Sequence, residues 1–181
     1  VATGSIKSKV DFKGKHQSVT VNDIFANPND NLFEINADGT LLGISFADGS
    51  LEVYDLTNSE NDIELFDNTS GYTHFEGGFY ERYFAFSATN SSDSIFAVID
   101  TIEKEQTGGF EADGYFGVDT DKNGIYVQRD NLLVKIHPVT GEQTPLVTTS
   151  ENIFRFAVSG THTLATSEDL VMFFDSNSNL I

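Results

Sequence analysis

The sequence predicts an all-β fold built from repeated four-stranded antiparallel units, and two observations indicate it. First, a clear hairpin phrase runs over Thr40–Leu56, where two runs of β-forming residues flank Asp48-Gly49, a pair that favours tight turns. Second, looser copies of this phrase recur along the 181 residues. Helix signals are poor, because the one helix-friendly phrase, Ile99–Gln106, is too short to form an autonomous helix.

The copies of the hairpin phrase share a register. Each copy ends in an aliphatic or aromatic residue followed by Asp, or in one case by His. These pairs are Val10-Asp11, Tyr54-Asp55, Ile99-Asp100, Ile136-His137 and Phe174-Asp175. A period of about 40 residues with four short strands in each unit is the signature of a β-propeller. The sequence therefore predicts propeller blades, whose strands we name a to d in chain order.

The register places each strand in order. Residues 1–25 are predicted to be a blade remnant, with strands ending or lying at Val1–Gly4, Ser5–Asp11 and Ser18–Ile24. The blade of residues 31–66 is predicted to contain Leu32–Asn36, Thr40–Phe46, Ser50–Leu56 and Asp62–Phe66. The blade of residues 72–110 is predicted to contain Tyr72–Glu76, Arg82–Ala88, Ser94–Asp100 and Glu105–Phe110. The blade of residues 113–148 is predicted to contain Tyr115–Val118, Ile125–Gln128, Leu132–His137 and Glu142–Thr148.

The last unit is an incomplete blade over residues 153–175, with strands at Ile153–Val158, Thr163–Thr166 and Leu170–Asp175. Inner strands are apolar on both faces, as at Leu41-Leu42, which is typical of a sheet sandwiched between neighbouring sheets. The strand count exceeds by one what a closed four-bladed ring accommodates. We therefore expect about four blade-equivalents of a larger ring, with a closed four-bladed ring as the alternative.

Composition narrows the class of partner. The formal net charge of −18 argues against nucleic acid, because phosphate binding needs a basic surface. The chain has no cysteine, which excludes disulfides and cysteine-based zinc sites. No run approaches the roughly 20 apolar residues of a membrane span, so membrane insertion is not expected. These features do not distinguish a cytoplasmic from a bacterial extracytoplasmic location.

The sequence resembles the WD-repeat and YVTN-like β-propeller superfamily in three features. These are the repeat period, the paired residues that end strand c, and the hairpin DGSLEVYDL at Asp48–Leu56. Tyr, Ile, Val or Phe stands where the WD-repeat motif has Trp, and the Gly-His pair that opens many such repeats is absent. The resemblance implies a propeller that binds partners through its loop faces.

An aromatic phrase at Tyr72–Tyr83 is the first candidate site. We expect it near a loop between blades, at the mouth of the central channel, with Arg129 on the same face. The candidate binding residues are Tyr72, His74, Tyr80, Glu81, Arg82 and Arg129. The alternative is that the aromatic side chains fill gaps between sheets.

A calcium loop is the second candidate. Asp119, Asp121 and Asn123 have the D-x-D-x-N-G spacing of such loops. The alternative is a simple a–b hairpin turn, since Asp and Asn suit tight turns. His137 takes the place that Asp holds in the other repeats, and we expect it to fix the turn that follows strand c.

Together these observations predict a non-enzymatic propeller module that acts as a protein–protein interaction scaffold, without a cofactor. The expected partners are another protein or the missing propeller blades. Two alternatives stay open at this point, namely a ligand- or glycan-binding sensor domain of a bacterial extracytoplasmic protein and part of a propeller enzyme.

Overall fold

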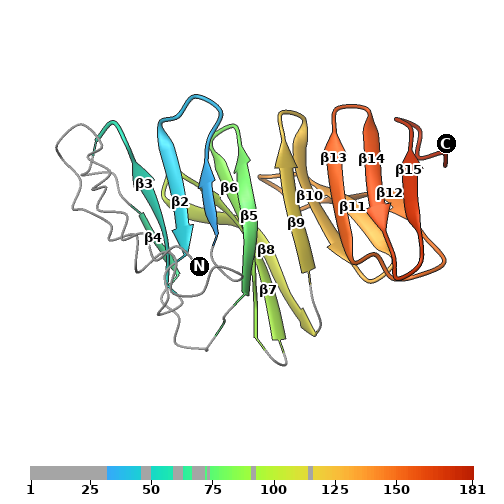
Figure 1. The fold of residues 1–181 in the computed structure, drawn as a ribbon. Coiled ribbons are helices and arrows are strands. Elements are labelled where there is room, and N and C mark those ends of the chain that lie inside the picture. Colours follow the sequence, from blue (N-terminus) through green and yellow to red (C-terminus); the bar gives the residue numbers. More distant parts are fainter. Residues whose placement is uncertain are drawn as a thin grey trace, which may run out of the picture.

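The computed structural model describes residues 32–45, 50–58, 63–66, 72, 74–90, 93–113 and 116–181. The expected blade remnant of residues 1–25 lies outside these residues. The described chain is all-β and folds into four antiparallel sheets (Figure 1). Within it, no helix is long and apolar enough to cross a membrane.

Within each sheet, strands that are consecutive in the sequence lie next to each other, and every pairing is antiparallel. The first sheet contains β1 (Phe33–Ile35), β2 (Leu41–Ser45), β3 (Leu51–Asp55) and β4 (Ile63–Phe66). The second contains β5 (His74–Tyr80), β6 (Tyr83–Thr89), β7 (Asp93–Asp100) and β8 (Glu105–Asp113). The third contains β9 (Phe116–Asp121), β10 (Gly124–Arg129), β11 (Leu132–Ile136) and β12 (Gln143–Thr148). The fourth contains β13 (Arg155–Ser159), β14 (His162–Thr166) and β15 (Val171–Phe174). The predicted four-stranded antiparallel blades are confirmed.

The four sheets stand in a row, joined through their a strands. β1 contacts β5, β5 contacts β9, and β9 contacts β13. These four strands run in the same direction, so in every sheet the a–b and c–d turns lie at one end of the strands and the b–c turns at the other end (Figure 1). We call these the a–b end and the b–c end. The first and last sheets lie at opposite ends of the row.

Three apolar clusters fill the spaces between neighbouring sheets. Between the first and second sheets the cluster includes Val53 and Phe84, and between the second and third it includes Val98 and Ile125. The third cluster, around Leu133 and its neighbours, joins the last two sheets. Because the middle sheets bury side chains on both faces, their strands carry apolar residues without strict alternation.

β5 extends further than the sequence predicts. The Gly77-Gly78 pair was expected near a loop between blades, but it lies inside this strand. A Cβ at Gly77 would collide with the backbone oxygen of Ala85, and one at Gly78 with the side-chain oxygen of Thr120. The glycines therefore mark a close approach of neighbouring strands, which is a common reason for glycine inside a strand.

The position that ends strand c has the same role in every described sheet. One side-chain acceptor atom of Asp55, Asp100 and His137 accepts the N–H groups two and three residues further along. The Asp175 carboxylate accepts those two and four residues further along. The expected role of His137 in fixing the following turn is confirmed. The equivalent residue of the first repeat, Asp11, lies outside the described residues.

Replacing Asp100 tests this role. Its side chain is almost fully buried and also pairs with Arg82, whose Nη2 lies 2.6 Å from the Asp100 Oδ2. Asp100→Ala removes the acceptor of two N–H groups and the ion pair, so we expect a loss of about 3 kcal/mol in unfolding free energy. Asp100→Asn keeps one acceptor oxygen and should lose clearly less. Denaturant unfolding measures both, with Asp169→Asn as an exposed control, and equal losses for the Ala and Asn variants would contradict the role.

Gly43 provides a second test of the packing. A Cβ there would lie 2.6 Å from Cε2 of the fully buried Phe84 ring. Gly43→Ala should therefore lower the unfolding free energy by about 1–3 kcal/mol through overpacking. Gly108→Ala is the matched control within a strand, because its nearest new contact, at 3.6 Å, is an ordinary one. An equal effect of the two substitutions would show that the first and second sheets are not packed this closely.

Candidate functional site

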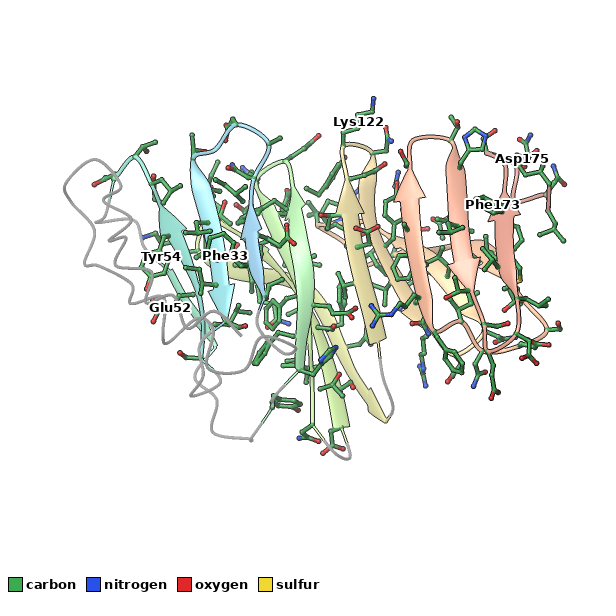
Figure 2. The ribbon with its side chains drawn as sticks, viewed as in Figure 1. Phe33, Glu52, Tyr54, Lys122, Phe173 and Asp175 are labelled. Atoms are coloured by element: carbon green, nitrogen blue, oxygen red, sulfur yellow. The ribbon has the colours of Figure 1, made fainter. Side chains whose placement is uncertain are left out.

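A cleft of about 890 Å³ opens at the a–b end, between the first three sheets. Turns from all three sheets line it, together with side chains of the adjoining a strands. Its polar lining includes Glu34, Asn36, Asp38, Thr40, Asp55, Thr57, Glu81, Arg82, Thr101, Lys104, Thr120, Asp121 and Lys122. Lys122 marks this end of the third sheet in Figure 2.

The turn between β1 and β2 is held in shape by its own polar side chains. The Asn36 Oδ1 accepts the backbone N–H groups of Thr40 and Leu41, each at 2.8 Å. The Asp38 carboxylate accepts the Thr40 hydroxyl at 2.6 Å, and this hydrogen bond lowers the pKa of Asp38. Gly39 allows the turn because its φ of 73° lies in the left-handed region. The Asp38 side chain is therefore a fixed negative charge at the mouth of the cleft.

The turn between β5 and β6 contributes Glu81 and Arg82. Glu81 has a φ of 53°, as a tight two-residue turn requires. Arg82 pairs with Asp100, and its backbone oxygen accepts both the N–H and the hydroxyl of Thr101. The a–b and c–d turns of the second sheet are thus tied together where they border the cleft.

Carboxylates outnumber cations in the lining. There are five carboxylates, Glu34, Asp38, Asp55, Glu81 and Asp121, against the three cations Arg82, Lys104 and Lys122. The charge of Arg82 is largely offset by its ion pair with Asp100. The cleft therefore favours positively charged groups.

Carboxylates also link neighbouring a strands. Glu76 accepts the Val118 N–H at 3.3 Å, and Asp119 accepts the Val158 N–H at 3.2 Å. Asp121 continues the series by accepting the N–H of Gly160 at 3.0 Å. Val118 and Val158 lie in the next a strand, and Gly160 lies in the turn that directly follows β13. These bonds join adjacent sheets at the strands that lie closest together.

The environment shifts the pKa of these acids in opposite directions. Desolvation raises the pKa of Asp119, and the nearby charges of Asp121 and Glu76 add to this, although two backbone hydrogen bonds oppose it. Desolvation and the charge of Asp119 likewise raise the pKa of Glu34. Desolvation also acts on Asp121, but hydrogen bonds from Gly160 and its own turn outweigh it, so its pKa is lowered. Asp121 therefore remains charged when its neighbours begin to take up protons.

The predicted binding residues do not form one patch. Glu81 and Arg82 line the cleft, whereas Tyr72 is buried in the first inter-sheet cluster. Tyr80 packs against the second cluster, where desolvation raises the pKa of its hydroxyl. Here the alternative, that the aromatic residues fill gaps between sheets, describes what is found.

His74 and Arg129 lie away from the cleft. His74 begins β5, and its Nε2 lies 3.5 Å from Glu76 Oε1. Arg129 ends β10 at the b–c end, where its Nε lies 3.9 Å from Asp130 Oδ2. The expectation that Arg129 shares a face with Arg82 is wrong, because Arg82 lies in an a–b turn and the two kinds of turn occupy opposite ends of the sheets.

Of the three predicted calcium ligands, Asp119 and Asp121 lie in β9, and Asn123 lies in the a–b turn that follows it. The Asp121 carboxylate accepts two backbone N–H groups of this turn, the Asn123 side-chain amide and the Tyr126 hydroxyl. Asn123 therefore presents its NH₂ group, not its oxygen, toward Asp121. Among the described residues, no group of three or more His, Cys, Asp or Glu side chains is placed to hold a metal ion.

Several lining residues carried no signal in the sequence. Glu34, Asp38 and Lys104 are ordinary polar residues of strand ends and turns. Only the meeting of turns from three sheets, separated by about one repeat each, makes them neighbours. The one sequence signal that groups them is the regular period, because it makes the a–b and c–d turns of successive repeats equivalent.

No family model and no curated protein matches the sequence. Among solved structures, the C-terminal WD40 domain of Sif2 is similar at 16% identity and a TM-score of 0.55, over 82% of this chain and 44% of that one. BamB from Moraxella catarrhalis is similar at 13% identity and a TM-score of 0.57, over 82% and 47%. The AfRom2 CNH domain is similar at 11% identity and a TM-score of 0.53, over 83% and 55%. These likenesses show the fold, a divergent β-propeller, and the chain spans about half the length of these structures.

The pH dependence of stability tests the hydrogen bonds of Asp121. A carboxylate whose pKa is lowered on folding stabilises the fold above its unfolded pKa and loses this contribution as pH falls through the folded pKa. Asp121→Asn should therefore lower the unfolding free energy by about 1 kcal/mol at neutral pH and by progressively less in acid. Asp169→Asn, at an exposed turn, is the control. Denaturant unfolding across the acid range checks this, and a loss that stays constant with pH would contradict it.

Proposed function

We propose that this β-propeller is a non-enzymatic interaction module that binds a basic segment of a protein partner in the cleft at its a–b end. The observation that carries the proposal is the meeting of turns from three sheets around one cleft of about 890 Å³ with an excess of carboxylates. Binding at such loop-rich ends uses side chains that a rigid scaffold positions.

The charges of the cleft support a basic partner. All three lining cations, Arg82, Lys104 and Lys122, lie in turns, and the charge of Arg82 is offset by its ion pair with Asp100. A chain with a net charge of −18 also attracts a basic segment over a distance, which increases the rate of encounter. Lysine or arginine side chains entering the cleft would meet Glu34, Glu81 and Asp121.

The hydrogen bonds of the lining acids support recognition over catalysis. Asp38, Asp55 and Asp121 each accept hydrogen bonds from the turn to which they belong. Their carboxylates therefore stabilise turns, and the hydrogen bonds lower the pKa of Asp38 and Asp121, which makes these two carboxylates weaker general bases. The remaining lining acids are Glu34 in β1 and Glu81 in the turn after β5, and carboxylates presented by two neighbouring sheets suit a peptide segment.

The volume of the cleft is also compatible with a small ligand, since ligand pockets span roughly 300–1,000 Å³. Glycan recognition commonly relies on aromatic side chains that stack on sugar rings. Phe79 is the single aromatic residue among the described residues that line the cleft. We therefore place the protein partner first and the small ligand second.

Charge reversal at the cleft tests the proposal. We expect an oligolysine peptide to bind, with an affinity that falls as salt is added. The double variant Asp38→Lys with Glu81→Lys should weaken binding by roughly tenfold or more, equivalent to about 1.4 kcal/mol. Fluorescence anisotropy of a labelled peptide measures this.

The matched control is Glu168→Lys with Asp169→Lys. It makes the same change in net charge in the turn between β14 and β15, at the b–c end. Equal weakening by the two double variants would show that net charge, and not the cleft, attracts the peptide, and would contradict the proposal.

A further inference from the structure

The cleft at the a–b end has an apolar floor. Leu41 of β2 and Phe79 of β5 both line it, and both are partly buried side chains that pack against the cluster between the first and second sheets. The a strands of these two sheets, β1 and β5, contact each other and both finish at the a–b end (Figure 1). The floor is therefore the end of an inter-sheet core that opens into the cleft.

Both floor residues are held in place by their neighbours. The centroid of the Phe79 ring lies 4.7 Å from that of Phe84, which is fully buried. The backbone N–H of Leu41 donates to the Asn36 Oδ1 at 2.8 Å. A surface that is already held in this way loses little conformational freedom when a partner binds, which favours affinity.

Ile102 adds an exposed apolar side chain to the lining. It lies in the c–d turn of the second sheet and is 64% exposed. The Asp100 carboxylate accepts its N–H at 3.0 Å, and the hydroxyl of the preceding Thr101 donates to the backbone oxygen of Arg82. A turn of fixed backbone thus presents a large aliphatic side chain in the same cleft as the apolar floor.

The two sheets that form the floor also carry acidic residues at the cleft. Asp38 belongs to the a–b turn of the first sheet and Glu81 to that of the second. An apolar centre with a polar rim is the usual anatomy of a protein–protein interface. A segment made of lysine alone would leave the apolar centre uncovered, whereas an apolar residue between basic residues would match both parts of the lining.

We propose that the basic segment recognised by the cleft carries a large aliphatic residue with lysine or arginine on both sides, and that this residue packs on Leu41, Phe79 and Ile102. The inference rests on the proposed function, since it specifies the class of segment that the same cleft binds. Packing removes apolar surface from water and adds affinity that charge alone does not supply. Because salt screens charges and not this contribution, the preference for the aliphatic residue persists as salt is added.

Two peptides of equal charge test the inference. One has lysines on both sides of a central leucine, and the other has serine in place of the leucine. We expect the unmodified chain to bind the leucine peptide about fivefold more tightly, equivalent to about 1 kcal/mol. Fluorescence anisotropy of the labelled peptides measures the ratio of the two affinities, and this ratio should remain when added salt weakens the binding of both.

A substitution at the exposed apolar position locates the preference in the cleft. Ile102→Ser should lower the ratio to about twofold or less, because less apolar surface is then covered. Val139→Ser is the matched control and should leave the ratio unchanged. Val139 has the equivalent place in the third sheet, two residues after the end of strand c, and is 52% exposed, but it lies outside the lining of the cleft.

The possible outcomes distinguish this inference from the proposed function. Equal affinities of the unmodified chain for the two peptides would overturn the inference and still support a basic partner. An unchanged ratio in Ile102→Ser would also overturn it, as would an equal fall in Ile102→Ser and Val139→Ser, which indicates apolar contacts outside the cleft. Binding of neither peptide would contradict the proposed function itself.

Discussion

A single side-chain acceptor at the end of strand c is the interaction on which the described structure depends most. This acceptor stabilises the turn after strand c, from which the chain continues to the position of strand d at the edge of the sheet. The acceptor is Asp55, Asp100, His137 or Asp175 in the four sheets. In the last sheet this turn brings Leu180 back to pair with Phe174, where a fourth strand would run. Because the acceptor recurs at a fixed place, it sets the register of each repeat and the position of its turns.

The position of these turns leads directly to the candidate site. Once the c–d turns are fixed, they lie beside the a–b turns at one end of every sheet, and the Arg82–Asp100 pair joins the two kinds of turn in the second sheet. Carboxylates on the a strands then bridge from one sheet to the next, as Asp119 does to Val158. Asp121 takes part in both, because it bridges to Gly160 of the next sheet and also contributes to the negative charge of the cleft.

The sequence predicted the strands well because the cues are local. Asp and Gly in turns, apolar runs and the recurring pair at the end of strand c are each contained in a few residues. The predicted β5 is too short, because the composition of Gly77-Gly78 indicates a loop. In the structure these glycines allow close contact with β6 and β9. That contact involves Ala85 and Thr120, which no local pattern connects to the glycines.

The candidate site was predicted only in part for a similar reason. Glu81, Arg82 and Asp121 were noticed as polar residues in turns, but their meeting in one cleft depends on how the first three sheets are stacked. The most direct test of peptide binding in the cleft is amide chemical-shift mapping of the isotopically labelled chain titrated with an oligolysine peptide. We expect shifts within residues 36–40, 81–82, 101–104 and 120–122, which contain most of the residues that line the cleft. Shifts confined to the b–c end, around Arg129 and Glu168, would contradict it.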